Sequence, residues 1–389
     1  MKQTEKLYDL DAYRTEFEGT VLSCEKIVEK EKDVYQVILD KTLFFPEEGG
    51  QSPDKGTIQG KTVIDVQIKE EVITHTLLEP IEIGEVVHGV IDWKHRFSNM
   101  QQHSGEHIFS GLVNQKFGYD NVGFHLSDQI VTMDFNGVLS AEEASEIEYA
   151  ANEVIAKNLP IQVSFPTKEE LEQLEYRSKI EIEGQVRIVT IPETDVCACC
   201  APHVRRTGEI GLLKIISLQN HRGGVRISIL CGFRALEDYR KRIAVISQLS
   251  ASLSANLETL PEAVEKIKAF NQSLKTELVD SKKAYMEARI EAIPETQENV
   301  YLFEKNLDAQ DMRGVVNQLV SNHVGVCGIF VGDDTEGYRF IMGSSAMDVR
   351  TVMAHLKETL EVKGGGSAAM VQGSVVAKKE TLMELLNTR

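Results

Sequence analysis

The sequence predicts an α+β protein built from several domains, and three observations support this expectation. The chain has 389 residues, which is enough for about two to four domains of ordinary size. Its apolar spacing changes along the chain from the period of strands to the period of helices. Glycine is absent from residues 236–293, where a long helical segment is expected. The predicted domains are residues 1–92, 93–235, 236–293 and 294–389.

The first of these segments has the pattern of a small β-barrel from about residue 17 onward. Apolar residues recur at every second position in segments 35–39 and 64–68, which is the spacing of half-buried strands. Glycine and proline turn signals separate the runs. Short strands at this spacing favour a barrel.

The second segment, residues 93–235, predicts an α+β domain. Its first part has the apolar spacing of a helix, and its last part alternates as strands do. Helices are expected over 94–117 and 141–159, and strands over 185–191, 211–217 and 225–230.

The third segment, residues 236–293, shows apolar residues at heptad-like steps of three and four. This spacing predicts a helical hairpin or a coiled coil, with Asn271 as the polar core position that sets its register. Pro261 predicts the start of a second helix. Two interpretations stay open, self-association with a second copy and a helical pair that packs only on its own chain.

The last segment, residues 294–389, predicts an αβ unit. Strands are expected over 324–331 and 338–342 and a helix over 348–362. Residues 363–367, with three consecutive glycines, are expected to form a very flexible loop.

Two pairs of side chains predict a metal site. His103 and His107 lie four positions apart, which places both imidazoles on one face of a helix. Cys199 and His203 are also four apart, in a loop-like stretch. Three imidazoles and one thiolate suit tetrahedral Zn²⁺. The metalloprotease pattern is absent, because Ser104 stands where its glutamate would be.

Spacing alone does not decide which cysteine supplies the thiol ligand. Cys197 and Cys200 form a CxxC motif, and Cys200 forms a CxxH motif with His203. Spacing also leaves open a closed zinc site that only stabilises the domain. With six cysteines in the chain, a disulfide scaffold is not expected, and such a cluster is more often metal-binding or catalytic.

Charge predicts a local basic surface on an acidic protein. The chain carries a net charge of −18, yet residues 201–242 contain nine basic residues and three acidic ones. This contrast favours a phosphate-facing site and argues against indiscriminate coating of nucleic acid. The alternative is a solvated strand edge.

Composition also gives the expected location. No apolar run approaches the ~20 residues of a membrane span, and the N-terminus is charged and lacks the apolar core of a signal peptide. We therefore expect a cytoplasmic protein without a membrane partner.

Several segments together resemble the long form of the alanyl-tRNA editing proteins (AlaX), and equally the editing and C-terminal regions of alanyl-tRNA synthetase. The matching stretches are FFPEEGGQ at 44–51, IDWKHRFSNMQQHSGEH at 91–107, GFHLS at 123–127, VRIVTIPETDVCACCAPHVRRTGEIGLLKI at 186–215, RGGVRISILCGFRAL at 222–236 and KGGGSAAMVQGS at 363–374.

The resemblance implies an aminoacyl-tRNA deacylase that hydrolyses seryl- or glycyl-tRNA(Ala) without ATP and so protects translation fidelity. It implies a translation-factor-like barrel at 17–92, a zinc-binding editing domain at 93–235 and a DHH-associated-like domain at the C-terminus. It also implies a homodimer, formed through residues 236–293 or the C-terminal domain or both.

The resemblance also assigns site residues. The zinc ligands are His103, His107, Cys199 and His203, which decides the thiol for Cys199. Beyond what the resemblance implies, we take Gln51 and Glu106 as the catalytic candidates, and Gly49, Gly50, Phe124 and His125 as the substrate-binding ones. The alternative for Glu106 is a side chain that faces away from the pocket. We expect zinc mainly to orient the substrate. RNA contacts are expected from Arg205, Arg206, Arg222, Arg226, Gly364, Gly365 and Gly366.

Two departures from the family pattern concern the pocket. Cys200-Ala201-Pro202 replaces the usual Gly-Gly-Thr before the last histidine, so a hydroxyl near the metal is missing. Glu106 stands where glutamine or threonine is common. With no aminoacylation domain before the barrel and no DHH motif, we expect neither a synthetase nor a phosphodiesterase.

Two other functions compete with the deacylase. One is a non-catalytic tRNA-binding protein with a structural zinc site. The other is a metallohydrolase that acts on a different nucleotide ester. The basic stretch and the C-terminal unit favour a whole tRNA as the substrate.

Overall fold

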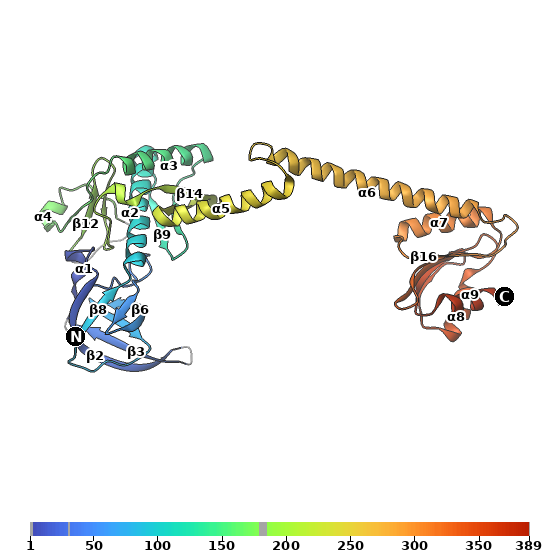
Figure 1. The fold of residues 1–389 in the computed structure, drawn as a ribbon, viewed down its shortest axis with the longest axis horizontal. Helices are drawn as coiled ribbons and strands as arrows, with labels where there is room; N and C mark the ends of the chain where they lie inside the picture. Colours follow the sequence, from blue (N-terminus) through green and yellow to red (C-terminus); the bar gives the residue numbers. More distant parts are fainter. Residues whose placement is uncertain (1–2, 30–31, 179–184, 389) are drawn as a thin grey trace. The chain divides into compact units, whose positions relative to one another are not determined.

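The structure, a computed structural model, describes residues 3–29, 32–178 and 185–388. It divides into two compact units, Met1–Leu249 and Ser250–Arg389 (Figure 1). Several separate sheets and helices make up the described residues, which confirms the predicted α+β class. No described helix is both long enough and apolar enough to cross a bilayer.

Six strands of the first unit close into a barrel in the order β2-β3-β7-β6-β5-β8. They are β2 Glu16–Glu29, β3 Lys32–Leu39, β5 Gly56–Ile58, β6 Lys61–Lys69, β7 Val72–Leu77 and β8 Val86–Ile91. A β-bulge in β6 falls between Val63 and Asp65, and a bulge changes which side chains face inward. Val63 and Val66 are therefore buried, whereas Ile64 is 48% exposed. The predicted alternation of residues 64–68 is wrong at Ile64.

A short N-terminal segment that the sequence analysis did not anticipate closes one side of this barrel. Strand β1 (Glu5–Lys6) pairs with β4 (Lys41–Thr42), and helix α1 (Leu7–Leu10) follows. Leu7 and Tyr8 belong to the barrel core. Their burial explains why so short a helix is stable.

Helix α2 (Trp93–Phe117) is the central element of the second part of this unit (Figure 1). Asp92 caps its start by accepting from the His95 amide at 3.1 Å, and Gly118 ends it in the left-handed region, at a φ of 71°. The helix packs against a sheet of order β14-β15-β10-β9 and against α3. The other elements here are β9 Asn121–Leu126, β10 Val131–Phe135, α3 Ala141–Ala156, β11 Gln162–Ser164, α4 Lys168–Leu171, β12 Ile188–Ile191, β13 Asp195–Ala198, the 3₁₀ helix η1 Thr207–Ile210, β14 Leu213–His221 and β15 Gly224–Cys231.

A buried ion pair joins α2 to the barrel. Arg96 is fully buried and donates through Nε to Asp54 Oδ2 at 2.9 Å, and its Nη1 donates to the Ala12 carbonyl at 3.0 Å. Asp54 also accepts from the Phe45 amide at 2.6 Å. These bonds fix the loop of residues 44–54 against α2, and this loop carries the predicted glycine motif.

Two long helices follow, as the sequence predicts. They are α5 (Gly232–Leu253) and α6 (Leu260–Glu291), and Pro261 occupies the first turn of α6. Buried side chains are few: Ala235 in α5, and Met286 and Ile290 in α6. Helix α5 begins before the boundary drawn at residue 236, and the four-part division of the chain stays a prediction.

The rest of the second unit is a five-stranded sheet of order β16-β17-β18-β20-β19 with helices. Its elements are β16 Val300–Glu304, α7 Ala309–Asn322, β17 Cys327–Asp333, β18 Gly337–Gly343, α8 Val349–Thr359, β19 Val362–Gly366, β20 Met370–Val375 and α9 Lys379–Asn387. The loop predicted over residues 363–367 is wrong, because Gly364, Gly365 and Gly366 lie in β19 and pair with β20.

Candidate functional site

The four predicted metal ligands come together in the first unit. His103 and His107 lie one turn apart on α2, and Cys199 and His203 lie just after β13. Cys199 Sγ is 3.5 Å from His103 Nε2 and 3.4 Å from His203 Nε2. The ligand atoms of all four side chains lie within 4.8 Å of one another. These residues could therefore hold one metal ion.

A hydrogen bond to Nδ1 fixes the orientation of each histidine ring. Gln51 Oε1 lies 2.8 Å from His103 Nδ1, Asp195 Oδ2 2.8 Å from His107 Nδ1, and Ser104 Oγ 3.0 Å from His203 Nδ1. Each ring therefore has its Nε2 left to bind a metal. Metal-binding histidines in proteins are usually held in this way by a second partner.

The protonation of two of the four groups, Cys199 and His203, suits a metal, whereas the hydrogen bond to Asp195 outweighs burial and raises the pKa of His107 well above its usual range. Burial alone would raise the pKa of Cys199, but the neighbouring His103 and His203 outweigh it and hold this pKa well below its usual range. Burial lowers the pKa of His203 to about 3. A thiolate and a neutral imidazole are the forms that bind metal ions.

The other two cysteines of the cluster differ from Cys199. Burial raises the pKa of Cys197 to about 11 and raises that of Cys200 as well, so both thiols keep their protons at neutral pH. Cys197 belongs to a second group with His107 and Asp195, but Asp195 there already binds Arg177 at 2.8 Å. The group around Cys199 is the better candidate.

The distances fit a tetrahedral ion. For zinc with bonds of about 2.3 Å to sulfur and 2.0–2.1 Å to nitrogen, a tetrahedral angle places sulfur and nitrogen about 3.5 Å apart. The two Cys199 Sγ to Nε2 distances, 3.5 and 3.4 Å, agree with this value.

The glycine motif lies beside the metal group. Gly49 and Gly50 have φ values of 60° and 81°, and a Cβ on Gly50 would lie 2.5 Å from the Phe124 carbonyl oxygen. This close approach lets Gln51 reach His103. The Phe124 ring centroid is 4.7 Å from that of His103, whereas His125 is exposed on the strand and points to its other face.

Gln51 offers a polar atom that no described protein group satisfies. The side chain is fully buried, its Oε1 contacts His103, and its Nε2 has no hydrogen-bond partner among the described residues. A buried donor without a partner costs about 1–3 kcal/mol. Such a donor next to a metal group is suited to a bound ligand.

Comparisons with known proteins find similarity to two families and to several curated proteins. The family described as "Threonyl and Alanyl tRNA synthetase second additional domain" matches residues 186–227, and "tRNA synthetases class II (A)" matches residues 3–95. The alanyl-tRNA editing protein AlaX-L of Pyrococcus horikoshii is 26% identical, over 98% of this chain and 97% of its own length. The mouse alanyl-tRNA editing protein Aarsd1 is 28% identical, over 93% of this chain and 92% of its own.

The resemblance to the alanyl-tRNA editing proteins is confirmed over nearly the whole chain. The chain is also 32% identical to the alanine–tRNA ligase of Ignicoccus hospitalis, over 72% of this chain but only 32% of the ligase. The likeness to that ligase therefore covers about a third of the ligase's length.

Glu106, at one of the positions where the chain departs from the pattern of the proteins it resembles, is buried against the metal group. Its Oε1 accepts from Ser110 Oγ and from Asn121 Nδ2, both at 2.6 Å. Its Oε2 lies 4.0 Å from His107 Nε2. Two donors thus fix one oxygen, and the other lies near the position expected for a metal.

Sequence reasoning missed the partners that hold the ligands. Asp195 lies two residues before the cysteine cluster and Ser104 directly after the first histidine, so both could have been found by searching near the ligands for hydrogen-bonding groups. Arg187 gave no such signal. Its Nη1 donates to the Cys199 and Ala201 carbonyls at 2.7 and 2.9 Å, which fixes the loop that departs from the family pattern.

The four arginines predicted to bind RNA are not equally available. Arg226 makes two bonds to Asp134, at 2.6 and 2.7 Å, and Arg205 contacts Asp11 at 3.1 Å. Arg205, Arg206 and Arg222 are all exposed, and Arg206 Nη2 donates to the Asn158 carbonyl. Gly364, Gly365 and Gly366 belong to the other unit.

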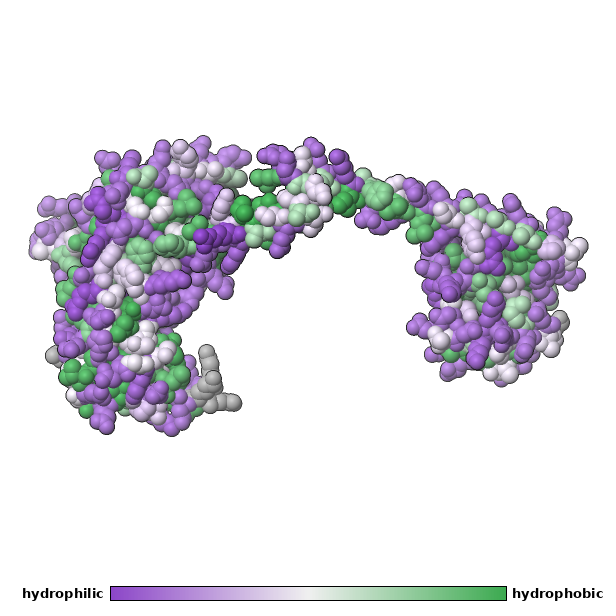
Figure 2. Space-filling view, viewed as in Figure 1, coloured by the Kyte–Doolittle hydropathy of each residue, from purple (hydrophilic) through white to green (hydrophobic). Residues whose placement is uncertain are grey.

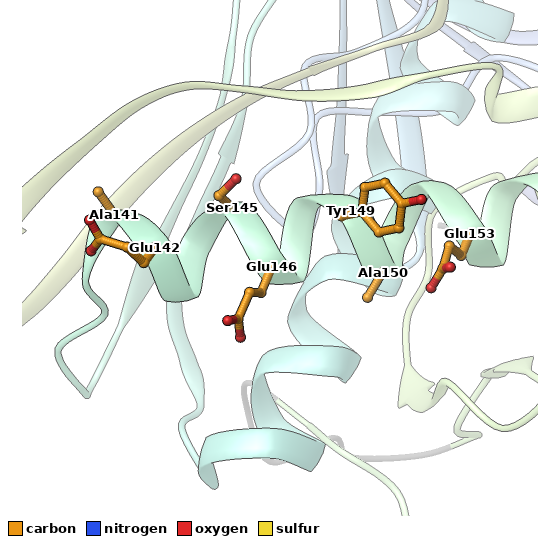
Figure 3. A pocket seen from close by; sticks show the side chains of 7 residues that line it. All are labelled: Ala141, Glu142, Ser145, Glu146, Tyr149, Ala150 and Glu153. Atoms are coloured by element: carbon orange, nitrogen blue, oxygen red, sulfur yellow. The ribbon is translucent and has the colours of Figure 1, made fainter.

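One face of the first unit is unsuited to RNA. Figure 3 shows Glu142, Glu146 and Glu153 along α3 together with Tyr149, where these residues line a hollow. Tyr149 is 72% exposed. Carboxylates in this number repel phosphates, so RNA is expected to approach from another side.

Proposed function

We propose that the protein hydrolyses the ester of tRNA(Ala) mischarged with serine or glycine, releasing the amino acid and the tRNA without ATP. The observation that supports this proposal is the convergence of three oriented imidazoles and a thiolate next to the unsatisfied Gln51 amide. The similarity to alanyl-tRNA editing proteins supports the choice of tRNA(Ala).

We assign the metal as Zn²⁺, held by His103, His107, Cys199 and His203. A zinc ion bound there would mainly hold the pocket and the substrate in a fixed orientation. Four protein ligands complete a tetrahedral shell. The side chains around the metal must therefore make most of the contacts to the aminoacyl group.

Gln51, Gly49, Gly50 and Phe124 form the proposed aminoacyl pocket. The Gln51 Nε2 donates to the serine hydroxyl, and the Phe124 ring forms an apolar wall. Alanine lacks that hydroxyl and leaves the buried amide without a partner. The free-energy cost of this unpaired donor disfavours alanine in the pocket. Glycine lacks the hydroxyl too, so its acceptance depends on its small size.

Glu106 is proposed to hold the positively charged α-amino group of the substrate. Ser110 and Asn121 fix its Oε1, so the carboxylate is already oriented before the substrate binds. Preorganised charge of this kind is effective in a site that excludes water.

The complete set of four ligands favours a second candidate, a non-catalytic tRNA-binding protein. Structural zinc sites are closed, whereas catalytic ones keep an open position. This candidate predicts affinity for tRNA without ester hydrolysis.

RNA binding and assembly complete the proposal. We place tRNA contacts at Arg205, Arg206, Arg222, Arg226 and at the glycines of β19. We also propose a homodimer formed through α6, with a contribution from the C-terminal sheet.

Deacylation assays on seryl-, glycyl- and alanyl-tRNA(Ala), with zinc content measured on the same samples, test the function. We expect hydrolysis of the first two only, and loss of both zinc and activity in His103→Ala and Cys199→Ala. Cys200→Ser is the matched control, because this neighbouring thiol lies outside the ligand set, and it should keep both. Full zinc with no hydrolysis would establish the non-catalytic candidate, and activity that survives zinc loss would refute the proposed role of the metal.

The role of Gln51 has a separate test. Gln51→Glu keeps an acceptor for His103 Nδ1 but removes the amide donor. Zinc content should stay unchanged, while kcat/KM for seryl-tRNA falls by roughly 10- to 100-fold, the equivalent of losing one buried hydrogen bond. An equal loss for glycyl-tRNA would contradict recognition of the hydroxyl.

A further inference from the structure

A second cavity lies on the first unit, outside the metal group. It measures about 430 Å³ and lies where the start of α2, the turn after β9 and the start of α5 meet. Its lining includes Trp93, Lys94, Phe97, Asp128, Phe233 and Arg234. None of these residues has a role in the proposed chemistry.

The cavity presents flat surfaces. The Phe233 side chain is 60% exposed, and the Trp93 ring is held by Tyr13 and Phe97, with ring centroids at 5.2 and 5.3 Å. Trp93 is half-buried and Phe233 is exposed, and aromatic rings that reach the surface are where unpaired nucleic-acid bases stack.

Arg234 is fixed in place as a third flat group. It donates to Ser98 Oγ at 2.7 Å, to the Ser127 carbonyl at 2.7 Å and to Asn99 Oδ1 at 2.6 Å. A guanidinium held at three points loses little entropy when a base stacks on it.

The rim of the cavity adds polar groups of both signs. Asp128 contacts Lys55 at 2.5 Å, and a carboxylate of this kind can accept from the exocyclic amine of a base. Lys94 is exposed and can contact a phosphate. The cavity is thus equipped for a base and its backbone.

The cavity and the metal group are connected by two elements. Trp93 and His103 are ten residues apart on α2, which corresponds to about 15 Å along the helix. On the other side, Phe124 contacts the His103 ring, and Asp128 follows it by four residues. A strand of RNA that ends at the metal group can therefore reach the cavity within a few nucleotides.

We propose that this cavity binds one unpaired base of the 3′-terminal strand of the RNA while its aminoacyl end lies at the metal group. The identity of the RNA rests on the proposed function. The stacking itself does not require that any ester be cleaved.

Trp93 is the only tryptophan of the chain, so its fluorescence reports on this cavity alone. The full-length protein is titrated with uncharged tRNA(Ala) and with the same tRNA from which the unpaired 3′ nucleotides have been removed. Filter binding measures the affinity of each RNA in parallel. We expect the intact RNA to bind and to quench Trp93, and the trimmed RNA to bind more weakly without quenching.

Phe233→Ala tests the stacking surface, and Tyr149→Ala is its matched control, because Tyr149 is also an exposed aromatic residue, 72% against 60%, but lies on α3. The affinity for intact tRNA should fall on the order of 10-fold in Phe233→Ala, as expected for one lost stacking contact, and stay unchanged in Tyr149→Ala. The affinity for trimmed tRNA should stay unchanged in both variants.

Three results would overturn the inference: quenching by the trimmed RNA, absence of quenching by the intact RNA, or equal effects of the two substitutions. Quenching that depends on the 3′ strand, in a protein that cleaves no ester, would support this inference while refuting the proposed deacylase.

Discussion

Gly105 lies between His103 and His107 on α2 and allows the helix to approach β15. A Cβ at this position would lie 2.3 Å from Cys231 Sγ, and Cys231 is fully buried. We expect Gly105→Ala to lower stability by about 1–3 kcal/mol, the usual cost of overpacking, and to weaken metal binding, because the turn that carries both histidines must move.

Urea unfolding and zinc content measure this effect. The control is Gly314→Ala in α7, since a Cβ there meets nothing within 4 Å. That variant should be as stable as the wild type or gain up to about 1 kcal/mol. A stable, zinc-loaded Gly105→Ala protein would show that the helix has more freedom than its packing indicates.

His75 makes the barrel sensitive to acid. It is fully buried between Thr42 Oγ1 at 2.9 Å and the Val37 carbonyl at 3.1 Å, and burial lowers its pKa to about 4. The unfolded chain, with an ordinary histidine pKa near 6.5, binds this proton first. The stability of the fold therefore falls as pH drops through the window from about 6.5 to about 4.

This difference in pKa corresponds to a loss of about 2 kcal/mol between pH 7 and pH 5. Urea unfolding at the two pH values measures it. The glutamine in His75→Gln does not titrate in this range. The variant should therefore lose about 2 kcal/mol less of its free energy of unfolding than the wild type between pH 7 and pH 5. Equal losses in the two proteins would show that other groups cause the acid sensitivity.

At the scale of elements, α6 carries an exposed apolar stripe. Ile267, Leu274, Leu278 and Tyr285 are 48%, 44%, 56% and 53% exposed on the single chain, and apolar side chains are visible along this helix (Figure 2). Their three- and four-residue spacing suits the seam of a coiled coil. Apolar surface of this kind usually marks an interaction site.

If α6 pairs with a second copy as proposed, Leu274→Lys combined with Leu278→Lys should convert a dimer into a monomer, because the charges would be buried in the seam. Sedimentation equilibrium measures the change in mass. Thr276→Lys puts a single lysine on another face of α6 and should stay dimeric. A mass that is the same for all three proteins would favour the alternative of helices packing on their own chain.

Strand β19 explains why the prediction of a flexible loop at Gly364, Gly365 and Gly366 is wrong. Glycines in sequence indicate a flexible loop, because they permit many conformations. In the structure, Cβ atoms on Gly364 and Gly366 would lie 2.2 Å from the carbonyl oxygens of Gln372 and Met370. The run is needed for close pairing with β20, and this pairing partner decides its conformation.

At the scale of the whole molecule, metal removal should affect the two units differently. The proposed ligands all lie in the first unit, and a ligand at a thousandfold excess over its Kd stabilises a fold by about 4 kcal/mol. A chelator should therefore lower the unfolding temperature of this unit by about 10 °C and leave the second unit unchanged.

Trp93 fluorescence measures the thermal unfolding of the first unit, and circular dichroism measures the unfolding of both units. In His103→Ala, which should bind no metal, the first unit should unfold at the temperature of the chelator-treated wild type, whether or not the chelator is present. A chelator effect that persists in this variant, or one that appears in the second transition, would mean that the metal is bound elsewhere.

The sequence by itself determined the local parts of this protein. The barrel strands, helix α2 and the start of α6 at Pro261 follow from apolar spacing and caps, which are properties of neighbouring residues. The same holds for the two pairs His103–His107 and Cys199–His203, because spacing within a helix or loop fixes which side chains share a face.

Only the tertiary structure decided what these parts do together. It gave Cys199, the thiol that the resemblance implies, a lowered pKa while those of Cys197 and Cys200 are raised, because the protonation of a thiol depends on burial and on the charges that folding brings near it. It placed Gln51 on His103 and Asp195 on His107, and it turned the glycine run into β19. Such contacts join residues far apart in the chain, and no local pattern encodes them.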